Sequence, residues 1–214
     1  MKTDDLIQSL SGDLKPAPPG WAARRLALGL GAGALASTVL MVVWLGVRPD
    51  IMAALQTPMF WIKFAYAALA GVVLAAATSR LSRPGARLGG LAVAIALPFV
   101  LMGAMGAMRL AMAAREAWAA LLMGDSVEVC SWRIFVIGLP VLAGAVWAVR
   151  GLAPTRLTLA GLAAGGAAGA ISAVIYGFHC NESAAPFVAV WYTLGMAAVA
   201  ALGGVLGARL LRWR

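Results

Sequence analysis

The stretch LTLAGLAAGGAAGAISAVIYGF, from Leu157 to Phe178, contains no charged residue and forms one continuous apolar run. A helix needs about 20 mainly apolar residues to cross the hydrocarbon core of a bilayer, and this stretch has that length. Gly161, Gly165 and Gly169 recur at every fourth position, so they share one helix face and let a neighbouring backbone approach closely. The stretch therefore predicts a membrane-spanning helix that packs tightly against another helix.

Five more stretches of the 214-residue chain have a similar length and composition. The six predicted spans cover roughly 26–47, 59–78, 88–108, 134–149, 157–178 and 185–208. Hydrophobic residues make up 63% of the chain and charged residues 12%, which is typical of membrane proteins. We predict an all-α, polytopic six-transmembrane-helix bundle over 26–208, preceded by a tail and linker over 1–25 and followed by a short basic tail over 209–214.

The distribution of basic residues predicts that both termini lie in the cytoplasm, because cytoplasmic segments of membrane proteins carry an excess of Lys and Arg. In this orientation the outer loops contain only Arg48, Arg109, Arg115 and Arg133, and Lys63 lies inside the second span, from which its ammonium group is expected to reach the outer interface. The cytoplasmic segments contain Lys2, Lys15, Arg24, Arg25, Arg80, Arg83, Arg87, Arg150, Arg156, Arg209, Arg212 and Arg214. The net charge of +9 is therefore a topology signal, and no direct binding of nucleic acid is predicted.

Both cysteines then fall in outer loops, Cys130 just before the fourth span and Cys180 just after the fifth, where His179 and Glu182 are its neighbours. In an oxidising compartment such a pair forms a structural disulfide by default. A protonated His179 would instead favour a reactive Cys180 thiolate, and Cys130, His179 and Cys180 together would suit a transiently bound soft metal ion. No C-x-x-C or zinc-ligand spacing decides between these alternatives, and no resident cofactor is expected.

The N-terminal tail predicts a short amphipathic helix, with Thr3 as its cap and with Asp4 and Asp5 at its positive end. One face of this helix consists of Leu6, Ile7, Leu10 and Leu14. An anionic membrane surface favours lysine rather than aspartate beside such a face. The tail is therefore expected to bind a protein partner.

The sequence contains a single histidine, no phosphate-binding loop and no paired acids within a span, so catalysis is not expected. One alternative is a small transporter or channel-like protein for a soft metal ion, to which Met102, Met105 and Met108 would contribute thioether ligands, although such methionines more often pack in a core. A structural subunit of a larger membrane complex is a third possibility. The oligomeric state is left open.

Two motifs lie near the ends of the chain: Met1-Lys-Thr-Asp-Asp-Leu-Ile-x-x-Leu10, and His179-Cys-x-Glu-Ser-x-x-x-Phe187-x-x-x-Trp191-Tyr-x-Leu-Gly195. Combined with six spans and an outer cysteine before the fourth, they resemble the NrsF family of bacterial membrane anti-sigma factors over essentially the whole chain. The resemblance implies an inner-membrane protein that holds an extracytoplasmic-function (ECF) sigma factor inactive and releases it under metal or oxidative stress. It also implies that Cys130 and Cys180 are a periplasmic sensing pair. The sigma-binding residues that it implies are Thr3, Asp4, Asp5, Leu6, Ile7 and Leu10.

Overall fold

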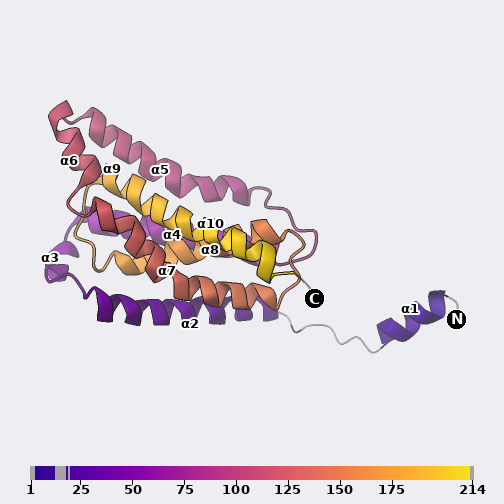
Figure 1. Ribbon diagram of the computed structural model, residues 1–214. Helices are drawn as coiled ribbons and strands as arrows, with labels where there is room; N and C mark the ends of the chain where they lie inside the picture. Colours follow the sequence, from indigo (N-terminus) through magenta and orange to yellow (C-terminus); the bar gives the residue numbers. More distant parts are fainter. Residues whose placement is uncertain (1–2, 13–17, 19, 213–214) are drawn as a thin grey trace.

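The computed structural model describes residues 3–12, 18 and 20–212, apart from the side chains of Leu6 and Leu10. Every regular element in these ranges is helical. Six helices are long and apolar enough to cross a membrane, which confirms the predicted all-α polytopic bundle (Figure 1). Of the positions used to predict the tails, Lys2, Leu14, Lys15 and Arg214 lie outside the described residues.

The long helices follow one another with short connections. The first five spans are α2 (Trp21–Trp44), α4 (Pro58–Leu81), α5 (Leu91–Ala111), α7 (Val127–Arg150) and α8 (Leu157–Tyr176). The sixth combines α9 (Ala185–Phe187), the π-helical segment η2 (Val188–Tyr192) and α10 (Thr193–Leu210). The shorter elements are α1 (Thr3–Gly12) in the tail, α3 (Ile51–Ala54), the 3-10 helix η1 (Arg115–Ala117) and α6 (Trp118–Met123).

Helix α8 forms the centre of the bundle. In its apolar 18-residue stretch 72% is buried, whereas the corresponding share for the peripheral α5 is 17%. Gly161, Gly165 and Gly169 face α10, which runs beside α8 in Figure 1. A β-carbon on Gly165 would lie 2.5 Å from the carbonyl oxygen of Val199, and one on Gly169 would lie 2.8 Å from that of Met196. The small side chains of α8 therefore allow backbone-to-backbone packing that larger residues would prevent.

Helices α2 and α7 are joined in a similar way along most of their length. A β-carbon on Gly33 would lie 2.7 Å from the carbonyl oxygen of Pro140. The Ser37 hydroxyl donates to the carbonyl of Ile137 at 2.6 Å, and near the other end of the pair Arg25 Nε donates to the carbonyl of Ala148 at 3.0 Å. The helix that follows the N-terminal tail is thus fixed to the helix that carries Cys130.

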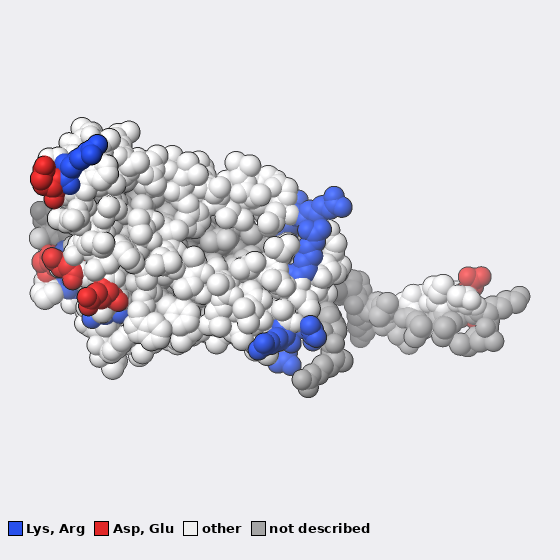
Figure 2. Space-filling model, turned by 45° about the horizontal axis from the view of Figure 1, so that its top comes forward, with Lys and Arg blue, Asp and Glu red and all other residues white. Residues whose placement is uncertain are grey.

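The two ends of the bundle differ in charge. At the end where both termini emerge, the charged residues of the described bundle are all arginines: Arg24, Arg25, Arg80, Arg83, Arg87, Arg150, Arg156, Arg209 and Arg212. Figure 2 shows this blue end, and red side chains mixed with blue at the opposite end. The described bundle has its acidic residues at that opposite end, where Asp50, Glu116, Asp125, Glu128 and Glu182 lie. The bundle therefore has a purely basic end and a mixed-charge end.

Candidate functional site: a buried dithiol at the mixed-charge end

Cys130 and Cys180 meet inside the mixed-charge end of the bundle. Both are free thiols and both are buried. Cys130 lies in the first turn of α7 rather than in a loop, because that helix begins at Val127, about two turns before the predicted span, whereas Cys180 does lie in the loop after α8. Cys130 lies close enough to Cys180 for its thiol to change the pKa of the Cys180 thiol. The sequence-derived pair is therefore brought together as a buried dithiol.

Aromatic side chains enclose the dithiol. Tyr176 from the end of α8 and Tyr192 from η2 are both fully buried, with ring centroids 5.8 Å apart. The same apolar cluster includes Phe187 and Ile134. Water therefore reaches the sulfur atoms poorly, and any reagent that attacks them has to be small.

The electrostatic surroundings of Cys180 favour its thiolate. The hydrogen bond from Cys130 lowers the pKa of the Cys180 thiol to about 6, and it is assisted by the charge of Lys63 and by the hydroxyl of Tyr192 against the opposing effect of burial. A thiolate is the form of cysteine that attacks disulfides and peroxides. Cys180 is therefore suited to be the nucleophile of the pair, and Cys130 to be the resolving thiol.

Lys63 does not reach the outer interface, and that prediction was wrong. Its side chain is only 2% exposed and turns inward, where Nζ donates to the carbonyl oxygens of Cys180 and Glu182, both at 3.0 Å. The ammonium group also lies 5.6 Å from the centre of the Tyr192 ring. Sequence position gave the depth of Lys63 in its span but not the direction in which it faces. A charged residue inside a span is nevertheless a signal for a functional role.

His179 does not belong to the dithiol, although it precedes Cys180 in the chain. Its Nδ1 lies 3.0 Å from the carbonyl oxygen of Gly46, so this nitrogen is the donor, and its Nε2 lies 3.2 Å from Arg133 Nη1, from which it accepts. Both ring nitrogens are engaged in holding the loop. Within the described ranges no three His, Cys, Asp or Glu residues are grouped so that they could bind a metal ion. The expected set of Cys130, His179 and Cys180 is therefore not assembled as a metal site.

Glu182 fastens the loop of Cys180 to the beginning of α7. Its Oε1 accepts hydrogen bonds from the backbone N–H groups of Asp125 at 2.8 Å and Ser126 at 3.0 Å, and from the Ser126 hydroxyl at 3.0 Å. A carboxylate suits this position because a helix N-terminus carries partial positive charge. Gly124, with φ of 55°, leaves room for the carboxylate, since a β-carbon there would lie 2.6 Å from it. Glu182 thus sets the position of Cys180 relative to Cys130.

Replacing Glu182 with alanine is expected to lower the free energy of unfolding by about 1–3 kcal/mol, because N–H groups at the start of α7 lose their acceptor. Unfolding of the purified protein in detergent, titrated with a denaturing surfactant, would measure this loss. Glu128→Ala is the matched control, because Glu128 is an exposed carboxylate in the first turn of the same helix. Equal losses in the two variants would contradict a specific role for Glu182.

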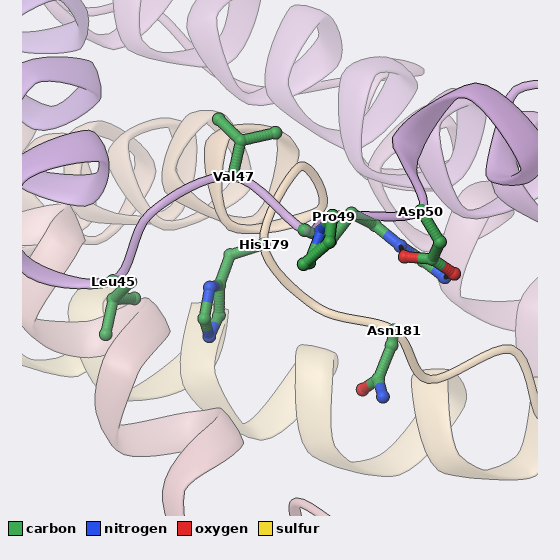
Figure 3. A pocket seen from close by; sticks show the side chains of 7 residues that line it. Leu45, Val47, Pro49, Asp50, His179 and Asn181 are labelled. Carbon is green, nitrogen blue, oxygen red and sulfur yellow. Dashed lines mark hydrogen bonds and ion pairs between the residues drawn. The ribbon is translucent and has the colours of Figure 1, made fainter.

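Arg48 joins the loop between α2 and α3 to the same region. Its Nη1 donates to the carbonyl of Cys180 at 3.1 Å, while its other nitrogens bind both carboxylate oxygens of Asp50 at 2.7 Å. This pairing raises the pKa of Arg48 and lowers that of Asp50. Asp50, His179 and Asn181 lie around an open hollow (Figure 3), which Arg48 also lines and which has a volume of about 580 Å³. The loop of Cys180 is therefore bonded to α4, to α7 and to the α2–α3 loop.

The N-terminal tail forms the expected helix, α1, beyond the basic end of the bundle (Figure 1). Thr3, Asp4 and Asp5 occupy its first turn and are exposed, and Ile7 is 58% exposed. The backbone of α1 places Leu6 and Leu10 one turn apart. Because the apolar side chain of Ile7 is exposed on this short helix, it is available for contact with a partner protein.

Residues that sequence reasoning missed complete the site. Tyr176 and Tyr192 enclose the thiols. Lys63 binds the loop of Cys180 from inside the bundle. The backbone N–H groups of Asp125 and Ser126 donate hydrogen bonds to Glu182. Tyr192 belongs to the sequence motif that ends at Gly195, but the motif by itself predicts no role for its hydroxyl. Lys63 could have been found from its charge alone, since it is the sole basic residue placed within a predicted span.

Comparison with known proteins gives consistent results over the full chain. Residues 10–213 match the model of a family described as "NrsF: Negative regulator of sigma F". The chain is 44% identical over 221 residues to "Anti-sigma-F factor NrsF" of Caulobacter vibrioides (strain NA1000 / CB15N), with both chains covered completely. It is 42% identical over 213 residues to "Probable anti-sigma-F factor NrsF" of Azospira oryzae (strain ATCC BAA-33 / DSM 13638 / PS), again with complete coverage. No solved structure shows significant similarity.

Proposed function

The chain belongs to the NrsF family of negative regulators of sigma F, and we propose that it is an anti-sigma factor of the bacterial inner membrane that binds a sigma factor of the ECF class. The observation that carries the anti-sigma role is the full-length similarity to two relatives that are named as an anti-sigma-F factor and a probable anti-sigma-F factor. Because the family consists of negative regulators, the protein acts by binding and not by catalysis, in agreement with the sequence.

The basic end of the bundle faces the cytoplasm in this proposal. Its arginines, and the lack of acidic residues there among the described part of the bundle, support this orientation. The tail that begins at this end is then on the side where sigma factors work. The dithiol, at the other end, faces the periplasm.

The N-terminal tail is the proposed sigma-binding element, through Thr3, Asp4, Asp5, Leu6, Ile7 and Leu10. An amphipathic helix binds a groove through apolar residues on one face. Asp4 and Asp5 would meet basic surface of the sigma factor that otherwise contacts promoter phosphates. This division of roles makes the apolar face the source of affinity and the acidic residues a source of orientation.

Replacing Leu6 or Leu10 with aspartate is expected to abolish capture of the sigma factor, because a charge would have to enter an apolar groove. The measurement is co-purification of the cognate sigma factor with the full-length protein from solubilised membranes. Gln8→Asp adds the same charge to the opposite side of α1 and should preserve capture. If Leu6→Asp and Leu10→Asp still capture the sigma factor, the contact lies in the inner loops instead.

The sensing element in the proposal is the dithiol of Cys130 and Cys180. Two free thiols in contact can form a disulfide without a large movement of the chain. The thiol form then corresponds to the state that binds the sigma factor, and oxidation in the periplasm releases it. The buried position and the absence of a third metal ligand among the described residues favour oxidation over metal binding as the chemical event.

Helix α7 connects the dithiol to the tail. A hydrogen-bonded pair of sulfur atoms must approach to about 2.05 Å when a disulfide forms, so α7 or the loop of Cys180 has to move. α7 contacts α2 at Gly33 and through Ser37 and Arg25, and α2 leads directly to the tail. Packed glycine contacts of this kind respond to small shifts by discrete rearrangement.

The transporter alternative receives little support from the third span. Met102 is buried against α4, whereas Met108 is 63% exposed on another side of α5. The methionines therefore do not line one path through the bundle. Packing explains Met102 and Met105, as expected for flexible apolar side chains.

A further inference from the structure

The buried hydroxyl group of Tyr192 makes no hydrogen bond to an oxygen or nitrogen atom in the described part of the chain, and the group beside it is the thiol of Cys180. Buried hydroxyl groups nearly always have a partner, so each exception calls for an explanation. Tyr192 is fully buried and its hydroxyl lies beside the thiol of Cys180. It also ends the π-helical segment η2, and such segments occur often at functional sites. The weak acceptor beside this O–H donor is therefore the Cys180 sulfur, and an oxygen atom added to that sulfur would be a stronger acceptor for it.

Lys63 provides a second donor with spare capacity. An ammonium group has three N–H donors, and two of those on Lys63 bind the carbonyls of Cys180 and Glu182. The ion pair found among the described residues joins Arg48 and Asp50, so Lys63 has no carboxylate partner there. A buried cation needs a counter-charge, and the thiol of Cys180 is able to supply it as a thiolate.

We propose that Lys63 and Tyr192 are positioning residues for oxidation of Cys180 by a small, uncharged oxygen-atom donor, the class to which hydrogen peroxide belongs. Lys63 holds the attacking thiolate, and Tyr192 donates a hydrogen bond to the oxygen atom that the thiolate receives. The inference rests on the proposed role of the cysteine pair as the sensor and specifies the chemistry that the sensor detects.

The reaction balances with the groups present. The Cys180 thiolate attacks one peroxide oxygen, so an S–O bond forms, the O–O bond breaks, and hydroxide leaves and combines with the proton that Cys180 had lost. The product at Cys180 is a sulfenic acid, whose oxygen the Tyr192 hydroxyl and the third N–H of Lys63 are placed to bind. The Cys130 thiol then attacks the Cys180 sulfur, and water leaves as the disulfide forms. Two thiols have been oxidised by two electrons in total, and one peroxide has become two waters.

Burial sets the size and charge of the oxidant. Cys130 is 0% and Cys180 3% exposed, beneath the aromatic cluster of Tyr176 and Tyr192. A hydrated metal ion or a bulky disulfide such as oxidised glutathione would have to open the cluster, whereas a peroxide is of the size of a water molecule or two. The groups that face Cys180, and so set the pH dependence of its reaction, are Arg48, Lys63, Cys130, Tyr176, Tyr192 and the backbone of Glu182.

The test uses the full-length, reduced protein in detergent and follows disulfide formation by mass-tag alkylation. Removing one hydrogen-bond donor to a developing charge costs on the order of a hundredfold in rate at the strongest sites, so Tyr192→Phe is expected to slow oxidation by hydrogen peroxide roughly tenfold to a hundredfold. The assay runs about two pH units above the Cys180 pKa of about 6, so that the thiolate is formed in both proteins, and oxidation by diamide, which transfers no oxygen, should then keep its wild-type rate in this variant. Tyr66→Phe is the matched control, because it removes a hydroxyl that binds Thr193 at 2.7 Å in the same cluster.

A second measurement addresses Lys63 through the pH profile of Cys180 alkylation in the Cys130→Ser background. Lys63→Met is expected to move the midpoint toward the value of an ordinary thiol, about 8.5. Lys63→Arg keeps the charge, so the midpoint in this variant should stay close to that of the protein with Lys63. A pure packing defect would change the rate at every pH without moving the midpoint, and that result would overturn the role of Lys63.

The role of Tyr192 is overturned if Tyr192→Phe reacts with hydrogen peroxide at the wild-type rate, or if diamide is slowed as much as the peroxide. These outcomes are independent of sigma binding. Both positioning roles can be confirmed while the oxidised protein still binds the sigma factor. In that case the proposed sensing function is wrong, but the proposed roles of Lys63 and Tyr192 in the oxidation of Cys180 are retained. If neither variant changes the oxidation and the oxidised protein releases the sigma factor, the sensor stands without these donors.

Discussion

Under hydrogen peroxide, cells in which Cys130→Ser and Cys180→Ser are combined are expected to keep the sigma factor at the membrane, whereas wild-type cells release it. The chain contains no other cysteine, so the double variant has no thiol to oxidise. Serine is close to cysteine in size, so the aromatic cluster around the site should remain packed. The effect is expected to be a complete loss of the response with retention of sigma binding before stress.

Cell fractionation with detection of the sigma factor in membrane and soluble fractions would measure this result, together with a sigma-dependent reporter. His179→Gln is the matched control, since His179 adjoins Cys180 in sequence but bonds to Gly46 and Arg133. It should respond as the wild type does. A normal response of the double cysteine variant would remove the dithiol from signalling, and a lost response of His179→Gln alone would favour the loop itself as the sensor.

The helices could be predicted from sequence because a bilayer leaves few options for the backbone. Inside lipid every N–H and C=O group needs a partner within the segment, so a long apolar run has to be a helix. The run from Leu157 to Tyr176 became α8 with nearly the predicted bounds. The start of α7 was misplaced because Val127 to Arg133 is polar enough to resemble a loop, although Ser126 and Glu128 are typical of a helix N-terminus.

The site was only partly predictable, for a physical reason. A meeting of Cys130 and Cys180 could be expected because the basic residues place both cysteines at the outer ends of the fourth and fifth spans. The direction of a side chain around its helix, however, depends on which neighbours enclose it. Lys63 and His179 show this most clearly: the former turned toward the loop, and the latter turned away from the thiols to Arg133. The unpaired hydroxyl of Tyr192 has no signature in the sequence at all.

The glycine pattern was visible in the sequence, while the helix that packs on it was not. Gly161, Gly165 and Gly169 predicted a close helix contact without naming the partner, and Gly203 and Gly207 in the last span showed the same spacing. In the structure the two stripes face each other, so that a β-carbon on Gly207 would lie 2.8 Å from the α-carbon of Gly161. Matching stripes in two spans were the available signal for this pairing.

Replacing Gly165 with leucine is expected to destabilise the bundle by at least about 1–3 kcal/mol, the usual effect of overpacking a close-packed interior. The new β-carbon would lie 2.5 Å from the carbonyl oxygen of Val199 and 2.9 Å from the α-carbon of Ala200. Both neighbours are backbone atoms and cannot rotate away, so α8 and α10 have to separate. Thermal unfolding in detergent, followed by the loss of monodisperse protein in size-exclusion chromatography, would measure the effect.

Gly103→Leu on α5 is the matched control, because Gly103 is exposed and a β-carbon there meets no atom within 4 Å. Both variants add the same side chain to a membrane-spanning helix, so a difference between them reports the contact and not the loss of glycine. Equal stabilities would mean that α8 and α10 can separate at little cost. In that case the contact of Gly165 could not hold the bundle in one arrangement, and the movement of α7 on oxidation would be absorbed in the core before it reached α2 and the tail.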